Sequence, residues 1–194
     1  MRLKLRGKSF GGRAVLGPLS LEVERGDRVA ILGPSGIGKS TLLRIVAGLD
    51  PAFDGRLTGA DRLATVFQEP TLLPWRSARD NIMIPTGCDG PTASALMDRV
   101  GLPGREAQYP RQLSLGQQRR LSLARAFAAR PDVLLMDEPF ASLDAETATR
   151  MIDLTRDLLD DSGAGLLLVT HDPQEPARLG ARALRLSGTP AILG

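Results

Sequence analysis

Eight consecutive residues carry the clearest chemical pattern in the chain. Residues 33–40 read Gly-Pro-Ser-Gly-Ile-Gly-Lys-Ser and fit the pattern G-x-x-x-x-G-K-[ST]. Glycines allow a tight bend whose backbone N–H groups turn inward, where they and the N-terminus of a following helix can hold phosphate oxygens. Lys39 supplies a positive charge that can reach the outer phosphates, and the Ser40 hydroxyl suits Mg²⁺. The sequence therefore predicts a phosphate-binding loop for a nucleoside triphosphate.

The segments on either side of this loop support the prediction. Residues 27–32 are predicted to form a buried strand, and residues 41–47 an apolar helix that ends at Gly48. A strand, a loop and a helix in this order are the setting that a phosphate-binding loop needs. A glycine-rich turn that ends in Lys-Ser by chance is the alternative, and both flanks argue against it.

Two carboxylates follow a second predicted strand. Residues 133–136 form an apolar run typical of a buried parallel strand, and Asp137 and Glu138 come directly after it. Carboxylates at the end of a central strand are costly without a cation or water nearby, and ligands bind at this edge of an α/β sheet. We expect Asp137 to hold Mg²⁺ and Glu138 to act on the attacking water. Two surface acids in a turn are the alternative.

Polar residues also follow two other predicted strands. Gln68 ends the short strand predicted at 63–67, and His171, the only histidine, ends the strand predicted at 165–170. A glutamine there is usually a cap and a lone histidine is usually structural, but the shared sheet edge favours a function for His171. Asp172, Pro173 and Glu175 predict a helix start, with Asp172 as the cap and Glu175 reaching back to it.

Residues 76–130 lack strand patterns and are predicted as short helices separated by proline and glycine. The longest, from about residue 117 to 130, follows Leu-Ser-Leu-Gly-Gln at 113–117. Ser114 and Gly116 at a helix start fit a helix cap, and they fit a second anion site equally well, because free N–H groups point outward there.

Composition limits the class of protein. The chain has 194 residues, a formal net charge of +3 and one cysteine, so it forms no internal disulfide. Its Lys and Arg residues are spread out, which favours a solvated surface over a nucleic-acid-binding face. Residues 1–6 alternate charge with leucine, unlike a signal peptide, and no apolar run reaches the length of a membrane span. We expect a cytoplasmic chain.

The set of motifs resembles that of the ATP-binding cassette (ABC) transporter ATPases over nearly the whole chain. Each motif of that family has a similar stretch here, in the same order: an adenine-stacking aromatic at Phe10, Walker A at 33–40, the Q-loop at Gln68, the signature at 113–117, Walker B at 134–138, the D-loop at 142–144 and the H-loop at His171. Leu115 replaces the first signature glycine, Arg119 stands where many members have Gln, and the segment 54–63 is short for the family. We expect φ of Leu115 to be negative, with its side chain directed away from phosphate.

The resemblance implies an ATPase with ATP and Mg²⁺ as its cofactors. It makes Glu138 the general base, His171 a γ-phosphate contact and Gln68 a sensor of Mg²⁺ that links to a membrane subunit. Mg²⁺ would be held by Ser40, Gln68 and Asp137. The nucleotide would be bound by the adenine, phosphate-loop, signature and D-loop residues Phe10, Gly33, Pro34, Ser35, Gly36, Gly38, Lys39, Ser40, Thr41, Ser114, Gly116, Gln117 and Asp144.

The resemblance also implies a fold and an assembly. The fold expected is α/β, a P-loop NTPase (RecA-like) core with a mostly parallel sheet, an N-terminal antiparallel β edge and an inserted helical subdomain. Residues 1–194 would form a single ABC ATPase domain, with 1–75 and 131–194 as the nucleotide-binding core and 76–130 as the helical subdomain that carries the signature. Two chains would pair head to tail as a homodimer with two ATP molecules between them, and Ser114, Gly116 and Gln117 would act on the γ-phosphate bound by the other chain.

The stretch 68–76 resembles importers of the nitrate, sulfonate and taurine group, where it would line the groove that receives a permease helix. Pro70 to Trp75 is apolar for a loop, which fits either a packed connection or a docking surface. The expected function is the ATP-binding and ATP-hydrolysing subunit of an ABC import system, on the inner face of the cell membrane. It would power uptake through separate transmembrane permease subunits, with an extracytoplasmic solute-binding protein acting indirectly.

Two other classes of protein compete with this interpretation. A soluble ABC-type ATPase for DNA repair would carry a long coiled coil between Walker A and the signature, and residues 41–112 contain no heptads. One for iron–sulfur assembly is not excluded by length. A regulatory module that holds ATP without turnover would be expected to lack Glu138 and His171, and both are present.

Overall fold

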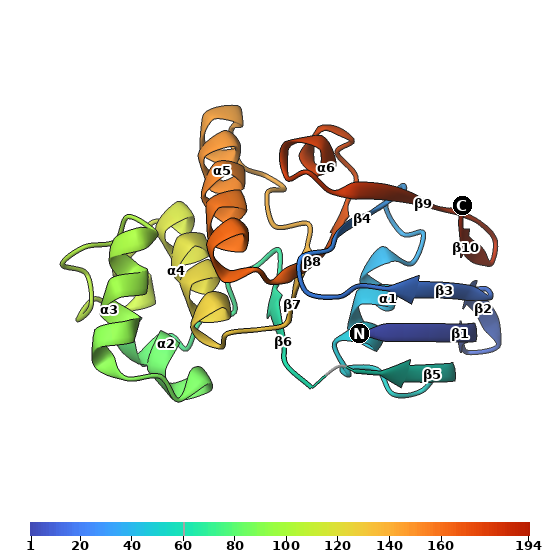
Figure 1. Ribbon diagram of the computed structural model, residues 1–194, viewed down its shortest axis with the longest axis horizontal. Helices are drawn as coiled ribbons and strands as arrows, with labels where there is room; N and C mark the ends of the chain where they lie inside the picture. Colours follow the sequence, from blue (N-terminus) through green and yellow to red (C-terminus); the bar gives the residue numbers. More distant parts are fainter. Residues whose placement is uncertain (60) are drawn as a thin grey trace.

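A five-stranded parallel sheet forms the centre of the molecule (Figure 1). The computed structural model describes residues 1–59 and 61–194. The parallel strands lie in the order β9 (Arg182–Gly188), β4 (Arg28–Leu32), β8 (Gly165–Thr170), β7 (Val133–Asp137) and β6 (Leu63–Val66). The inner strands are continuous apolar runs because both faces of the sheet are covered. The predicted mostly parallel α/β core is confirmed.

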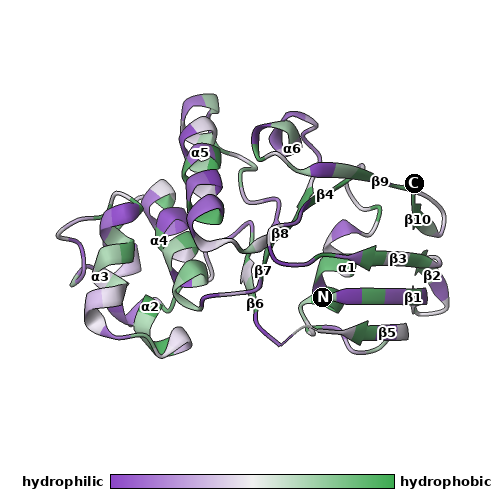
Figure 2. Ribbon diagram, viewed as in Figure 1, coloured by the Kyte–Doolittle hydropathy of each residue, from purple (hydrophilic) through white to green (hydrophobic). Residues whose placement is uncertain are grey.

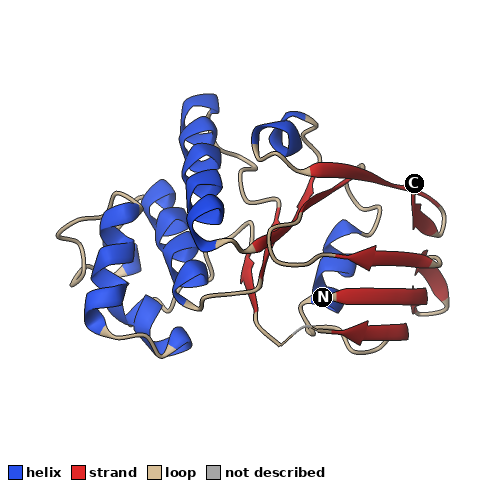
Figure 3. Ribbon diagram, in the orientation of Figure 1, coloured by secondary structure: helices blue, strands red, loops and turns tan. Residues whose placement is uncertain are grey.

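Antiparallel strands extend this sheet at the N-terminal side, as expected (Figure 3). They are β1 (Arg2–Phe10), β2 (Arg13–Leu16), β3 (Leu19–Glu22), β5 (Asp54–Thr58) and β10 (Ala191–Leu193). Strand β1 pairs with β2, β3 and β5, while β10 joins β2 to β9. The sequence did not predict β5, which falls in the segment that was noted only as short; residue 60 of that segment lies outside the described residues.

The helices occupy two places relative to the sheet. Helix α1 (Lys39–Val46) lies against the antiparallel strands, and α6 (Gln174–Arg178) lies near β9 (Figure 1). The helices α2 (Ala78–Thr86), α3 (Gly90–Arg99) and α4 (Leu115–Ala128) gather at the opposite end of the molecule, beside α5 (Ala145–Ser162). A short 3₁₀ turn, Pro110–Gln112, precedes α4. The helices fall where 76–130 was predicted to be helical, and their status as a separate subdomain stays a prediction.

Strand β7 shows how one apolar run serves two cores. Leu134 and Met136 pack with the helices α2 to α5, while Val133 and Leu135 pack with α1 and the antiparallel strands. Successive side chains of a strand point to opposite faces, so an unbroken apolar run is required wherever both faces are buried. Strand β1 is covered on one face only and alternates apolar and polar residues (Figure 2). Within the described residues, no helix combines the length and the apolar character needed to cross a membrane.

Candidate nucleotide site

The phosphate-binding loop joins β4 to α1, as the sequence predicts. Gly36 and Gly38 have φ values of 78° and 115°, in the range that favours glycine. A Cβ atom at Gly38 would lie 2.8 Å from Cδ2 of Leu16, so the site needs glycine for space as well as for conformation. The loop therefore passes close to β2 and ends at the first turn of α1, where the helix N–H groups are free.

Lys39 is the first residue of α1 and its side chain is 4% exposed. Its Nζ atom donates hydrogen bonds to the carbonyl oxygens of Gly33, at 2.8 Å, and Pro34, at 3.1 Å. The same atom lies 3.2 Å from Oε1 of Glu138. The Lys39 ammonium is thus buried, with two hydrogen bonds and one ion pair. A bound phosphate would compete with the Glu138 carboxylate for it.

Ser40 and Asp137 meet at the edge of the sheet. The Ser40 hydroxyl donates to Oδ1 of Asp137 at 3.0 Å, which brings together the side chains predicted to hold Mg²⁺. Burial raises the pKa of Asp137 above its ordinary value, opposed by this hydrogen bond and reinforced by the charge of Glu138. A hydroxyl and one carboxylate fit Mg²⁺, because this ion keeps several water ligands and takes substrate phosphates as others.

Glu138 and His171 form a second contact beside the first. Nδ1 of His171 lies 3.1 Å from Oε2 of Glu138. Glu138 has a φ of 45°, which is uncommon for a non-glycine residue, and its backbone N–H donates to the carbonyl of Val169 at 2.9 Å. Strained backbone of this kind collects at functional sites. The predicted general base is therefore held by the β8 backbone and faces the predicted H-loop histidine.

One cavity of about 410 Å³ collects most of the predicted nucleotide ligands, and we call it the nucleotide pocket. Its lining comes from β1, β2, the phosphate-binding loop, α1 and the ends of β6 and β7: Phe10, Val15, Ser35, Gly36, Gly38, Lys39, Ser40, Thr41, Gln68, Asp137 and Glu138. Phe10 is exposed at 52%, and Nζ of Lys8 lies 4.3 Å from its ring centroid. The sequence did not point to Val15, although its position on a strand next to Phe10 was a usable signal.

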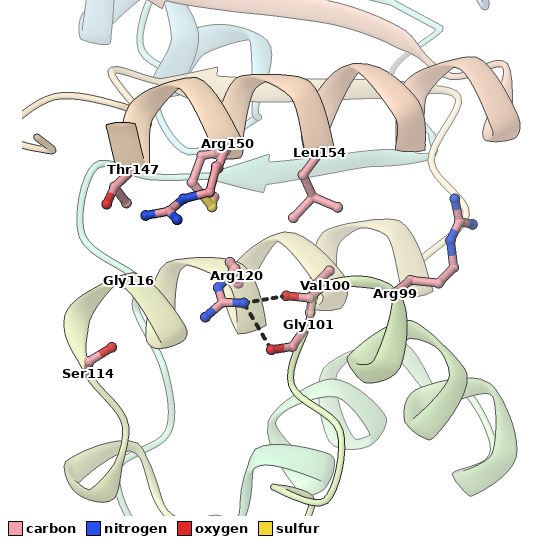
Figure 4. Close-up of a pocket in the computed structure, with 10 residues that line it drawn as sticks. Arg99, Val100, Gly101, Ser114, Gly116, Arg120, Thr147, Arg150 and Leu154 are labelled. Carbon is pink, nitrogen blue, oxygen red and sulfur yellow. Dashed lines mark hydrogen bonds between the residues drawn. The ribbon is translucent and has the colours of Figure 1, made fainter. Parts of the chain in front are cut away.

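The predicted signature residues lie elsewhere, around a cavity of about 520 Å³ that we call the signature cavity (Figure 4). Ser114 and Gly116 line it from the start of α4, Thr147 and Arg150 from α5, and Arg120 donates to the carbonyls of Val100 and Gly101. This cavity and the nucleotide pocket share no lining residue. One chain therefore holds the two predicted halves of the site apart.

The start of α4 is a capping box. The Ser114 hydroxyl accepts from the backbone N–H of Gln117 at 3.2 Å, and the Gln117 side chain accepts from the N–H of Ser114 at 2.9 Å. Both residues thus serve as a cap within the chain. Leu115 is the first residue of α4, and its side chain is 53% exposed. Its φ is not positive, so the expected negative φ is confirmed.

Other predicted ligands contribute through their backbone or lie outside both cavities. Gly33 and Pro34 offer their carbonyls to Lys39, as described above. Asp144 caps α5, where its side chain accepts from the N–H of Thr147 at 2.9 Å. His171 lines a third cavity of about 410 Å³ together with Ser142 and Leu143 of the predicted D-loop. Asp144 lines neither the nucleotide pocket nor the signature cavity, so its role as a nucleotide ligand stays a prediction.

Two buried charged residues were not predicted as such. Arg119 is 7% exposed, and its Nε and Nη1 atoms have no hydrogen-bond partner among the residues described; burial lowers its pKa. Glu175 was expected to cap α6 by reaching back to Asp172, and this prediction is wrong. Its carboxylate is buried next to the Thr170 side chain, while Asp172 accepts from the N–H of Gln174 at 2.8 Å.

The loop, the carboxylates at the end of β7 and the parallel sheet together define a P-loop nucleoside triphosphatase. The family described as ABC transporter matches residues 16–141, and on that match the chain belongs to the ABC transporter family. It is similar to aliphatic sulfonates import ATP-binding protein SsuB 2 of Burkholderia cenocepacia (strain HI2424), 43% identical over 97% of this chain and 74% of the relative. The protein of the same name from Mesorhizobium japonicum is 46% identical over 96% and 77%.

A solved structure gives the same result. The dimeric, post-hydrolysis structure of the ATP-binding cassette MJ0796 bound to ADP and Pi has a TM-score of 0.82 and 29% identity, covering 100% of this chain and 96% of that one. This chain is the ATP-binding and ATP-hydrolysing subunit of an ABC import system. The comparisons favour this function over a soluble ATPase for iron–sulfur assembly.

Proposed function

We propose that this chain powers the import of aliphatic sulfonates, as a homodimer docked on permease subunits at the cytoplasmic face of the membrane. The solute class is that named for its relatives, which are 43–46% identical over nearly the whole chain. The observation that carries the assembly is the separation of the nucleotide pocket from the signature cavity, since neither cavity alone contains the full set of ligands.

A head-to-tail pair would complete each site. The phosphate-binding loop of one chain would hold ATP, and Ser114 and Gly116 of the other would cover its γ-phosphate. The start of α4 suits an anion because its N–H groups and helix dipole face outward, and α4 is 14 residues long. Each ATP would then join two chains, so assembly and nucleotide binding would depend on one another.

Within each site, the residues would have different roles. The backbone N–H groups of the loop and Lys39 would bind the β- and γ-phosphates, and Phe10 would stack on adenine. Ser40, Asp137 and Gln68 would hold Mg²⁺, which supplies charge neutralisation at the phosphates. Because the γ-phosphate competes with Glu138 for Lys39, ATP binding would free the Glu138 carboxylate to accept a proton from water. His171 would orient Glu138 and contact the γ-phosphate.

Trp75 is the strongest candidate for a contact with the permease. It is 69% exposed on the loop that follows Gln68, whereas Leu72, which the sequence grouped with it, is partly buried against the helical core. Leu72 thus fits the packed-connection interpretation, and the docking role falls to Trp75 and to Ile84 on α2, which is also exposed. Large exposed apolar side chains tend to mark interfaces.

The test is reconstitution with the permease subunits and solute-binding protein in liposomes. Aliphatic sulfonates should stimulate ATP hydrolysis and enter the vesicles, while nitrate should do neither. Trp75→Ala should weaken assembly with the permease and leave ATP binding by the isolated chain intact. If assembly persists while the isolated variant loses stability, Trp75 is a core residue and the docking assignment is wrong. If another solute alone stimulates turnover, the solute class is wrong.

A further inference from the structure

Hydrogen bonds from backbone N–H groups to side chains hold the turn that carries His171. Thr170, the last residue of β8, is fully buried, and its hydroxyl accepts a hydrogen bond from the backbone N–H of Asp172 at 3.1 Å. The Asp172 side chain in turn accepts from the N–H of Gln174 at 2.8 Å. The backbone that follows His171 is therefore held by the side chains of Thr170 and Asp172.

Glu175 completes this set from α6. It is 7% exposed, its carboxylate lies next to the Thr170 side chain, and its Oε2 atom has no hydrogen-bond partner in the part of the chain that the structure describes. The Thr170 oxygen is the acceptor in the hydrogen bond from Asp172, so the hydroxyl proton remains free to point elsewhere. A carboxylate next to this hydroxyl favours the orientation in which the proton faces Glu175 and a lone pair faces the Asp172 N–H.

Burying Glu175 in this way is costly. Burial raises its pKa, whereas the neighbouring Thr170 hydroxyl and the nearby His171 oppose that rise. Helix α6 has only five residues, includes Pro176 and has no side-chain cap at Pro173, so little in its own sequence holds it in place. A buried, incompletely partnered carboxylate next to a catalytic dyad is more readily explained by function than by stability.

We propose that Thr170 and Glu175 are positioning residues, which hold His171 against Glu138 by fixing the backbone of the turn between β8 and α6. The Nδ1 atom of His171 lies 3.1 Å from Oε2 of Glu138, and a shift of the turn would lengthen this contact directly. Neither residue lines the nucleotide pocket, so both act through His171. This inference rests on the role proposed above for His171.

The experiment measures steady-state ATP hydrolysis by the purified chain. Thr170→Val keeps the shape of the side chain and removes the hydroxyl, so kcat should fall roughly 10- to 100-fold, since misplacement of catalytic groups by about 1 Å costs that much. The KM for ATP should change less than about twofold, because the phosphate-binding loop is untouched. Thr170→Ser restores a hydroxyl and should recover most of the lost turnover.

Two further variants separate positioning from general damage. Glu175→Leu should lower kcat as Thr170→Val does, and the double variant should be no worse than either, because both remove one contact. Thr149→Val is the matched control. Its hydroxyl accepts from Arg178 of α6 at 2.8 Å but belongs to α5 and makes no hydrogen bond to the turn itself, so turnover should remain within about twofold.

The decisive comparison is made in the His171→Ala background. If Thr170 acts through His171, Thr170→Val should cause no further loss there. An equal loss in both backgrounds, or unchanged turnover of Thr170→Val alone, would overturn the positioning role while leaving the proposed function intact. Unchanged turnover of His171→Ala would refute the role of His171 itself, and this proposal with it.

Discussion

Lys8 is a buried lysine next to Phe10, which lines the nucleotide pocket. Lys8 is 4% exposed, and its Nζ atom donates to Oδ1 of Asp50 and to the carbonyl of Ala52, both at 2.7 Å. The same ammonium faces the ring of Phe10. A buried ammonium needs partners of this kind, and a cation over one face of an aromatic ring is favourable. Asp50 therefore contributes both to stability and to the position of Phe10.

The first prediction concerns this ion pair. The hydrogen bond from Lys8 holds the pKa of Asp50 below its ordinary value, so its stabilising effect is complete above the unfolded pKa of about 3.9 and is lost as the pH falls through the lower folded pKa. Asp50→Asn should lower the urea midpoint at pH 7, and its difference from wild type should shrink below about pH 4. Asp98→Asn, an exposed control on α3, should show little difference at either pH. A difference for Asp50→Asn that does not change with pH would mean that charge is not the cause.

At the scale of the element, α4 tolerates a leucine at a signature glycine position because that position is helical. Leu115 needs no left-handed backbone, and an added side chain at Gly116 would meet open space in the folded chain. Exchanging leucine and glycine at these two positions should therefore have different effects on ATP turnover. Leu115→Gly should keep turnover within about threefold, with a stability loss of up to about 1 kcal/mol from a less rigid helix start.

Gly116→Leu should fold normally and lose ATPase activity, because its side chain would occupy the approach of phosphate to the free N–H groups of α4. Thermal unfolding and phosphate release on both variants provide the measurement. Similar activity for Leu115→Gly and Gly116→Leu would show that the start of α4 does not touch phosphate.

Helix α4 also buries the guanidinium of Arg119, which is incompletely hydrogen-bonded among the described residues. Two donor atoms of Arg119 lack hydrogen bonds among the described residues, and replacing a buried, poorly partnered charge with an apolar residue is often stabilising by about 1–4 kcal/mol. Arg119→Met should therefore raise the urea midpoint of the isolated chain. Arg79→Met, at an exposed site on α2, should leave it nearly unchanged. Destabilisation of Arg119→Met would indicate that the guanidinium is partnered in solution.

The sequence predicted the elements that chemistry or burial dictates, and missed those that depend on tertiary contacts. The phosphate-binding loop, β7 and β8 were predictable because fixed residue types and unbroken apolar runs leave few alternatives. Strand β5 was not, because Asp54–Thr58 is mostly exposed and its pairing with β1 is set by the fold. The reach of Glu175 back to Asp172 was predicted wrongly, because Glu175 is buried by the fold, and burial cannot be deduced from a local capping pattern.

For the molecule as a whole, the arrangement of the two cavities is the feature with the largest consequence. Phe10, Lys39 and Glu138 gather in the nucleotide pocket, whereas Ser114 and Gly116 line the signature cavity. No single-chain pattern could predict where two chains meet, because the contact depends on surfaces that stay apart within one copy. The family resemblance implies the head-to-tail pairing. The separation of the two cavities within one chain is a physical reason to propose it.

The most direct test of the shared site is the oligomeric state of Glu138→Gln with ATP. The amide keeps the shape of the side chain but is not a base, so turnover should fall roughly 10²- to 10⁴-fold while ATP binding persists. ATP would then stay between two chains. A matched control is the double variant Glu138→Gln with Gly116→Leu, which keeps the phosphate-binding loop and blocks the signature.

Size-exclusion chromatography with light scattering, alongside phosphate release, gives the answer. We predict that Glu138→Gln is monomeric without nucleotide and dimeric with ATP, and that the double variant stays monomeric in both conditions. Hydrolysis by Glu138→Gln at the wild-type rate, or a monomer at saturating ATP and high protein concentration, would contradict it.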